Sequence, residues 1–191
     1  PASLVTGVDL VVVSPGVPGD ISPLVAAREK GIPVWGEIEL AARYCRGRVI
    51  GITGSNGKST VTAMTGGILR GAGISGGTGG TLDTPICDLL EHDTEDAVHA
   101  VDLSSFQLET VDTFLPDVAM VLNLSPDHLD RYTDVEAYAD AKARILEVQT
   151  VDDAAILNAD DLPSARFRPA VRGRLYLFST EREVEQGAFV R

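Results

Sequence analysis

The chain has 191 residues, a length that supports one sizeable domain, or one domain plus part of another. Hydrophobic residues make up 44% of it and aromatic residues only 5%, so aliphatic side chains must form most of the core. The formal net charge of −12 argues against nucleic acid or an anionic membrane as a partner, although local lysines and backbone amides can still bind a nucleotide.

The first 46 residues are predicted to alternate strands and helices. The hydrophobic pattern indicates a buried strand at residues 9–14, a helix at 22–30, a strand at 33–35 and a helix at 37–44. We expect Ser22 to be the N-cap of the first helix, because Pro23 suits the first helical position and Gly31 suits its stop. A linker around Arg46 then marks a domain boundary.

The alternation continues beyond that boundary. Strands are predicted at 49–53, 97–103, 117–122, 154–157 and 173–178, and helices at 58–70, 85–90, 105–111 and 134–146. The glycine-rich residues 76–81 are expected to form a flexible loop, and the polar tail from Ser179 to contain no core element. The order of elements predicts an α/β fold, with a mostly parallel sheet flanked by helices.

The composition favours neither a disulfide framework nor a membrane protein. Cys45 and Cys87 lie far apart and lack the spacing of a zinc site, so we expect two free thiols. No apolar run has the length needed to cross a bilayer, and no signal-peptide pattern is present. Because the chain starts at Pro1 instead of Met, we expect it to be a piece of a longer protein.

Residues 49–60 have the layout of a nucleotide-phosphate cradle, in which an apolar strand leads through a glycine-rich turn into a helix. Glycines let the backbone aim N–H groups at phosphate oxygens, and the helix N-terminus adds its positive end. Lys58 can reach the β- and γ-phosphates, and the Ser59 hydroxyl can bind Mg²⁺. The predicted nucleotide-binding residues are Gly54, Ser55, Asn56, Gly57, Lys58, Ser59 and Thr60.

One departure from the usual pattern leaves an alternative open for residues 49–60. The strict phosphate-loop pattern has glycine at position 52, where this chain has Ile52, so the loop would be a variant of the form Gly-x-Asn-Gly-Lys-Ser/Thr. An ordinary strand–turn–helix with a solvated Lys58 is the other reading. Asp102 ends the apolar strand 97–103, where a second Mg²⁺ contact would lie, and this interpretation is favoured over the alternative of a helix N-cap.

Two further candidates lie towards the C-terminus. His128, between Asp127 and Asp130, follows a predicted strand, at the sheet edge where ligands bind in α/β folds, although a histidine flanked by aspartates can also be surface decoration. Lys142 shares the inward face of its helix with Tyr138 and is therefore a candidate for a reactive or modified lysine. The pattern alone favours a lysine that extends along the edge of the apolar stripe towards solvent.

Five motifs, in this order, resemble those of the Mur ligases, the ATP-dependent amide-forming enzymes of peptidoglycan precursor synthesis. They are residues 54–59 (GSNGKS), 103–109 (LSSFQLE), 127–132 (DHLDRY), 141–142 (AK) and 158–161 (NADD). The second and third motifs point to the branch of the family that adds D-glutamate. The end of that branch's N-terminal domain is similar to residues 13–17 (VSPGV) and 36–40 (GEIEL).

The resemblance implies a division of the chain. Residues 1–46 would be the C-terminal part of a Rossmann-like UDP-sugar-binding domain, and 47–180 the central ATP-binding domain. Residues 181–191 would be a linker or the start of a C-terminal domain. Because most of the two outer domains is then missing, the isolated chain is expected to be inactive.

The resemblance also implies roles for particular residues. Lys58 and Ser59 would serve the phosphates and Mg²⁺, and His128 would be the second Mg²⁺ ligand. Asp102 stands where the family more usually has glutamate, so its reach is one methylene shorter. Lys142 matches a lysine that is carbamylated in the family, which would place an anion beside the metal.

Two further sites concern the substrates. Asn158 matches a position near the nucleotide. Thr81 and Asp83 lie in a loop that usually reads Gly-Asn-(Ile/Leu)-Gly, and the missing asparagine bears on contacts to the muramoyl substrate.

The implied activity is an ATP- and Mg²⁺-dependent carboxylate–amine ligase of cell-wall synthesis. Its substrates would be UDP-N-acetylmuramoyl-L-alanine, D-glutamate and ATP, and it would act as a monomer in the cytoplasm. The alternatives are a related ligase that adds another amino acid or extends folate with glutamates, and a non-catalytic ATP-binding module. A phosphate-loop GTPase would need an Asn-Lys-x-Asp motif, which the sequence lacks.

Overall fold

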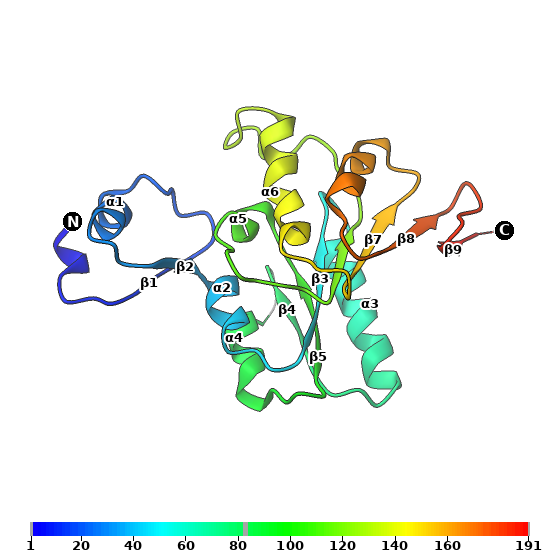
Figure 1. Ribbon diagram of the computed structural model, residues 1–191, viewed down its shortest axis with the longest axis horizontal. Helices are drawn as coiled ribbons and strands as arrows, with labels where there is room; N and C mark the ends of the chain where they lie inside the picture. Colours follow the sequence, from blue (N-terminus) through cyan, green and yellow to red (C-terminus); the bar gives the residue numbers. More distant parts are fainter. Residues whose placement is uncertain (1, 82–83, 191) are drawn as a thin grey trace.

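The computed structural model describes residues 2–81 and 84–190, so the expectation about Asp83 lies outside the described residues. In this part of the chain a seven-stranded sheet has the order β4-β5-β3-β6-β7-β8-β9 (Figure 1). Every pairing within it is parallel, which confirms the predicted α/β fold with a mostly parallel sheet.

The elements lie close to their predicted positions. The strands are β1 (Val11–Val13), β2 (Val34–Gly36), β3 (Arg48–Thr53), β4 (Thr78–Gly80), β5 (Val98–Asp102), β6 (Val118–Val121), β7 (Ala154–Asn158), β8 (Arg174–Ser179) and β9 (Gly187–Phe189). The helices are α1 (Ser22–Glu29), α2 (Glu37–Ala42), α3 (Lys58–Gly71), α4 (Ile86–Leu89), α5 (Ser105–Leu108) and α6 (Val135–Glu147). Among the described residues, no helix is both long and apolar enough to cross a membrane.

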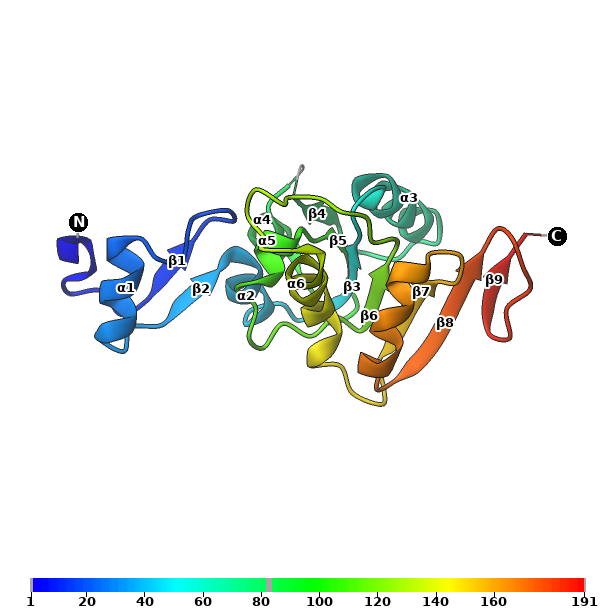
Figure 2. The same ribbon diagram turned by 90° about the horizontal axis from the view of Figure 1, so that it is seen from above.

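Helices cover both faces of the large sheet, with α3 on one face and α5 and α6 on the other (Figure 2). Successive side chains of a strand point to opposite faces, and the core follows that rule in β5. Ala100 packs with Ile52 under α3, whereas Val101 packs with Val121 and Ile145 under α6. The central strands are therefore apolar on both faces, as parallel strands between two helix layers must be.

The strand order determines where a site can form. β3 lies between β5 and β6, and all three run in the same direction. The segments that follow Thr53, Asp102 and Val121 consequently meet at one edge of the sheet, the edge at which ligands bind in open α/β folds.

The N-terminal part has its own small core. β1 and β2 form a separate two-stranded parallel sheet, and Ala26 and Ala27 of α1 pack against Val5. This part lies at one end of the molecule (Figure 1). The next helix, α2, instead buries Ile38 and Ala41 in the core of the large sheet. The packing thus joins α2 to the larger unit, while the division of the chain into domains stays a prediction.

Several local expectations are wrong. Ile21, with extended backbone, is the N-cap of α1, and Ser22 is the first helical residue. The glycine-rich segment expected to be a flexible loop contains β4, because β5 needs a backbone partner on that side and bonds to Ser75 and Gly77. The polar tail contains a strand that was not predicted, β9, which pairs Ala188 with Phe178 of β8, although none of its three residues is buried.

Candidate functional site

The turn between β3 and α3 leaves the first backbone amides of α3 without a side-chain cap. Gly57 is the N-cap of α3 and has φ of 82°, a left-handed conformation that favours glycine. Because Gly57 has no side chain, the first amides of the 14-residue helix α3 are not occupied by a capping group. This arrangement suits an anion, since the helix dipole adds partial positive charge.

A cavity of about 290 Å³ lies beside this turn. The residues that line it are Ser55, Asn56, Gly57, Lys58, Ser59, Thr60, Thr81 and Asp102. Six of the seven loop residues predicted to bind a nucleotide therefore surround one cavity, whereas Gly54 and Asn158 do not line it.

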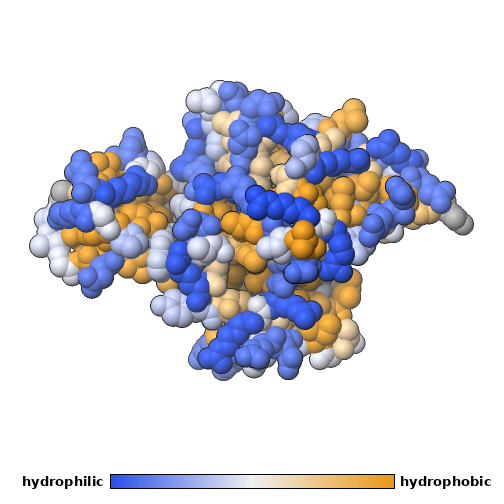
Figure 3. Space-filling view, viewed as in Figure 1, coloured by the Kyte–Doolittle hydropathy of each residue, from blue (hydrophilic) through white to orange (hydrophobic). Residues whose placement is uncertain are grey.

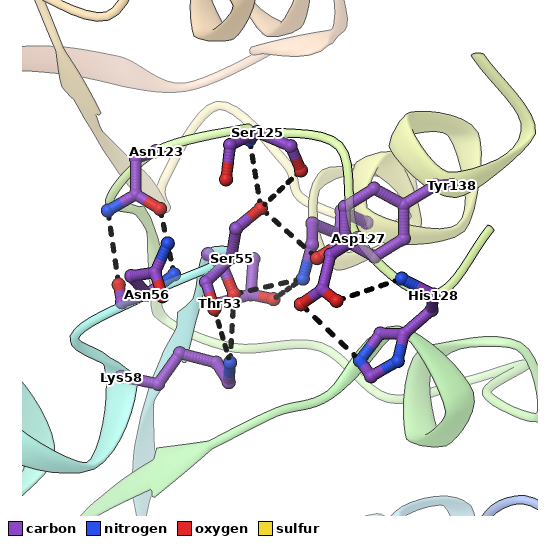
Figure 4. Close-up of polar contacts among 11 residues, drawn as sticks. Thr53, Ser55, Asn56, Lys58, Asn123, Ser125, Asp127, His128 and Tyr138 are labelled. Atoms are coloured by element: carbon purple, nitrogen blue, oxygen red, sulfur yellow. Dashed lines mark hydrogen bonds and ion pairs between the residues drawn. The ribbon is translucent and has the colours of Figure 1, made fainter. Parts of the chain in front are cut away.

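The position of Lys58 suits a phosphate contact. Its Nζ donates hydrogen bonds to the carbonyl oxygens of Gly54 at 2.9 Å and Ser55 at 3.3 Å. Burial lowers the pKa of Lys58, while the nearby carboxylates of Asp102 and Asp127 act to raise it. Figure 4 shows the ammonium group pointing back along its own loop. These contacts exclude the solvated lysine of an ordinary turn.

Asp102 and Ser59 offer oxygen atoms side by side. The Ser59 hydroxyl donates to Oδ2 of Asp102 at 2.6 Å, and the Thr81 amide donates to Oδ1 at 2.5 Å. Asp102 is buried at the end of β5, and Ser104, not Asp102, caps α5. A hydroxyl and a carboxylate at this position are ligands that Mg²⁺ prefers, so the donor set fits the predicted metal.

Sequence reasoning missed Asn123, which follows β6. Its Oδ1 accepts from the Asn56 amide at 2.9 Å and its Nδ2 donates to the Asn56 carbonyl at 3.1 Å. The Asn123 carbonyl also accepts from the Ser55 amide at 3.1 Å. One residue thus fixes two peptide units of the turn (Figure 4). Its position after a strand, at the edge where β3 also ends, is the only signal in the sequence.

His128 lies on the other side of the loop, with Asp127. Its φ is 53°, an uncommon left-handed value for a residue with a side chain. The His128 ring lies 4.8 Å from the Phe106 ring and 6.1 Å from the Tyr138 ring, measured between centroids. Nε2 is 3.6 Å from Oδ2 of Asp127. These contacts hold the ring near the loop while 42% of its side chain is exposed to solvent.

Lys142 is buried, with 1% of its surface exposed, so it does not extend along the helix to solvent. Its Nζ donates to the Gly54 carbonyl at 3.0 Å and to Thr53 Oγ1 at 3.4 Å. It also lies 4.7 Å above the Tyr138 ring. Burial and, less strongly, the charge of Lys58 together lower the pKa of Lys142 to about 7, against an opposing effect of Asp127.

Asn158 is outside this group of contacts. Its Nδ2 donates to the Leu122 carbonyl at 3.0 Å, and its Oδ1 accepts from the Asp160 amide. The side chain therefore ties the end of β7 to the end of β6. Its role near the nucleotide stays a prediction.

A second group of residues could in principle bind a metal, but two of them are hydrogen-bonded to each other instead. Cys45, Asp93 and His99 place one such atom each within 4.8 Å of one another. Nδ1 of His99 accepts from the Gly77 amide, so the ring proton lies on Nε2, which contacts Asp93 at 2.9 Å. A metal would need the lone pair of that nitrogen. Both cysteines are free thiols, and burial raises the pKa of Cys45 to about 11.

Known proteins similar to this chain agree on one family. Residues 52–189 match the model of the Mur ligase middle domain. A UDP-N-acetylmuramoylalanine–D-glutamate ligase of Acidobacterium capsulatum is 47% identical over 95% of this chain and 40% of its own length. Proteins of the same name from Koribacter versatilis and Anaeromyxobacter dehalogenans are 48% and 51% identical, over 96% and 91% of this chain. The chain spans about 40% of the length of these relatives.

Solved structures show the same fold at low sequence identity. A UDP-N-acetylmuramate:L-alanyl-γ-D-glutamyl-meso-diaminopimelate ligase from Neisseria meningitides has a TM-score of 0.66 at 15% identity, over 93% of this chain and 61% of its own. A MurF ligase from Thermotoga maritima, in complex with ADP, has a TM-score of 0.60 at 16% identity, over 92% and 49%. The match to the family model covers most of the sheet and its phosphate loop, and the chain therefore belongs to the Mur ligase family.

Proposed function

We propose that this chain is the ATP-binding part of a ligase that adds D-glutamate to UDP-N-acetylmuramoyl-L-alanine. The observation that carries the proposal is the cavity in which Lys58, Ser59 and Asp102 meet at the N-terminus of α3. The names of the similar proteins support the same substrates, and ADP in the MurF complex supports ATP as the nucleotide.

The proposed reaction has two steps. An oxygen of the L-alanine carboxylate attacks the γ-phosphorus of ATP, giving an acyl phosphate and ADP. The amine of D-glutamate then attacks the acyl carbon, inorganic phosphate leaves, and the amine loses a proton. Negative charge gathers on the transferring phosphoryl group, so Lys58 and the loop amides contribute by electrostatic stabilisation.

Ser59, Asp102 and His128 are the proposed protein ligands for Mg²⁺, which when bound would neutralise charge on the phosphate oxygens. Lys142 is the proposed site of a carbamate. Its amine nitrogen would attack the carbon of CO₂ and lose a proton, which replaces a buried cation by an anion. A pKa of about 7 leaves much of the amine neutral, as this attack requires.

A second cavity, of about 420 Å³, lies between the N-terminal part and the side of the larger unit formed by α5, α6 and nearby loops, and we call it the joint cavity. Ser14 and Gly16 line one side, and Arg131 and Arg144 line the other. We propose that it holds part of the nucleotide-sugar substrate, because guanidinium groups suit diphosphates. The monomeric state and cytoplasmic location implied by the resemblance stay predictions.

Calorimetry with Mg·ATP on this chain tests the proposal. Lys58→Ala should reduce the affinity by about 100-fold, since a charge-assisted contact to phosphate is lost. The exposed Lys30→Ala is a matched control and should bind like the wild type. Equal affinities of the two variants would contradict a phosphate site at the loop. A protein that binds ATP but shows no D-glutamate-dependent phosphate release at full length would instead be a binding module.

A further inference from the structure

Glu39 is a fully buried carboxylate that the site described above does not use. It lies on α2 with 0% of its surface exposed. Its oxygens accept from the amides of Asp112 at 2.8 Å, Thr113 at 2.9 Å and Phe114 at 3.2 Å, and from the Thr113 hydroxyl at 2.6 Å. Arg43 adds an ion pair at 2.7 Å. Burying a carboxylate is costly, and these partners offset that cost.

The electrostatics show that Glu39 is anionic in place. Burial acts to raise the pKa of Glu39, but hydrogen bonds from Thr113 and Asp112 and the charge of Arg43 together lower it below its usual value. Oε2 accepts all three backbone amides, while Oε1 accepts from the Thr113 hydroxyl and pairs with Arg43. A neutral amide has an NH₂ group in place of one of these oxygens, and an NH₂ group cannot accept from its neighbours. The segment 112–114 is therefore attached to α2 through the charged form.

The two segments that Glu39 joins carry opposite walls of the joint cavity. β2 runs directly into α2, with Gly36 as the N-cap, and Trp35 of β2 lines one wall. A Cβ on Gly36 would lie 2.0 Å from Thr110 Oγ1, so the strand passes very close to the other wall. That wall includes Thr110 and Asp112, and the Asp112 amide is one of those that Glu39 binds.

Two arginines also contact residues that line the joint cavity. Arg43 lies 4.0 Å from the centroid of the Trp35 ring while it pairs with Glu39. Arg131 donates to the Gly16 carbonyl on one wall and to Glu109 on the other, both at 2.9 Å. The spacing of the walls thus depends on a buried anion at α2 and on an arginine of the His128 loop.

We propose that Glu39 is a positioning residue that sets the spacing of the joint cavity and so determines the affinity for its ligand, without affecting the nucleotide site. The ligand is the nucleotide-sugar substrate, and this part rests on the proposed function. Glu39 itself lines neither cavity, and its effect is transmitted through the Asp112 amide, the rest of segment 112–114, and Arg43 against Trp35.

Trp35 is the chain's one tryptophan and reports on the cavity directly. In Glu39→Gln, acrylamide quenching of its fluorescence should rise about twofold, because the Arg43 and segment contacts loosen. Glu37→Gln is the matched control on the same helix, since Glu37 accepts a single amide hydrogen bond, from Cys87. Mg·ATP affinity should stay within about twofold in both variants. Unchanged quenching in Glu39→Gln would overturn the proposal.

In the full-length protein, Glu39→Gln should raise the KM for UDP-N-acetylmuramoyl-L-alanine about tenfold with kcat within about twofold. A fall in kcat at constant KM would overturn the proposal. If Glu39→Gln does not fold, the exposed Thr113→Val removes one donor and should shift quenching in the same direction; no shift would again overturn it. A wild-type chain that fails to bind ATP would refute the proposed function, while the quenching still decides the role of Glu39.

Discussion

Two lysines donate to the same carbonyl oxygen, that of Gly54, yet their surroundings differ. Lys58 reaches it from the loop at 2.9 Å and borders a cavity, whereas Lys142 reaches it from α6 at 3.0 Å and is buried. Nearby carboxylates oppose the effect of burial on Lys58, while Lys142 has a pKa of about 7. This contrast fits the roles we propose for them, a phosphate contact for Lys58 and a reactive amine for Lys142. Desolvation, more than the hydrogen-bond partner, separates the two roles.

Substitution of Lys142 should have the largest effect on activity. In the full-length protein, Lys142→Ala should lower kcat by about 1,000-fold, and acetate should restore part of the activity by supplying an anion in the vacated space. Lys142→Arg should be equally inactive without rescue, because a cation still fills the pocket. Steady-state kinetics with and without acetate measure both. Normal turnover of Lys142→Ala would remove the distinction between the two lysines.

Stability against pH tests the burial of Lys142 alone. Its pKa is about 7 when folded and about 10.5 when unfolded, so between these values the unfolded chain binds more protons and stability should rise with pH. Below about pH 7 both states are protonated and the cost of burying the charge is fully present.

We expect a rise on the order of 3 kcal/mol across this window relative to Lys142→Met, measured by urea unfolding in CO₂-free buffer. Lys58→Met is the matched control and should show a smaller difference, since Lys58 is less buried. Identical pH profiles for the wild type and Lys142→Met would mean that Lys142 reaches water.

Loosening the loop should have the smallest effect. Asn123→Ala removes the two side-chain hydrogen bonds to Asn56 and should weaken Mg·ATP binding about tenfold in calorimetry, because the turn amides lose their fixed orientation. The exposed Lys30→Ala serves as the comparison and should bind like the wild type. If Asn123→Ala binds Mg·ATP as tightly as Lys30→Ala, Asn123 does not organise the turn.

The sequence predicts best what is local. The glycines, Lys58 and Ser59 follow one another within a few residues, so the phosphate turn could be recognised from their spacing alone. The parallel sheet was likewise predictable from alternating elements. β4 and β9 were missed because their glycine-rich or polar sequences become strands only by pairing with β5 and β8.

The rest of the candidate site depends on tertiary contacts. Helical spacing placed Lys142 on an inward face but could not predict its hydrogen bond to the Gly54 carbonyl. The same spacing favoured a side chain that reaches solvent, whereas Lys142 is buried in the structure. Nothing near Asn123 or Glu39 in the sequence indicates that each would fix a distant backbone segment. Such residues are found only when the segments are brought together.

The parallel order of β5, β3 and β6 also has a consequence for folding. Ser59 and Asp102 are 43 residues apart in the chain, Asn56 and Asn123 are 67 apart, and Gly54 and Lys142 are 88 apart. Loops of this length must close before any of these bonds forms, and such non-local pairings make folding slow. The candidate nucleotide site is therefore expected to assemble late, so nucleotide affinity during refolding should report completion of the sheet, whereas the helical signal should appear earlier.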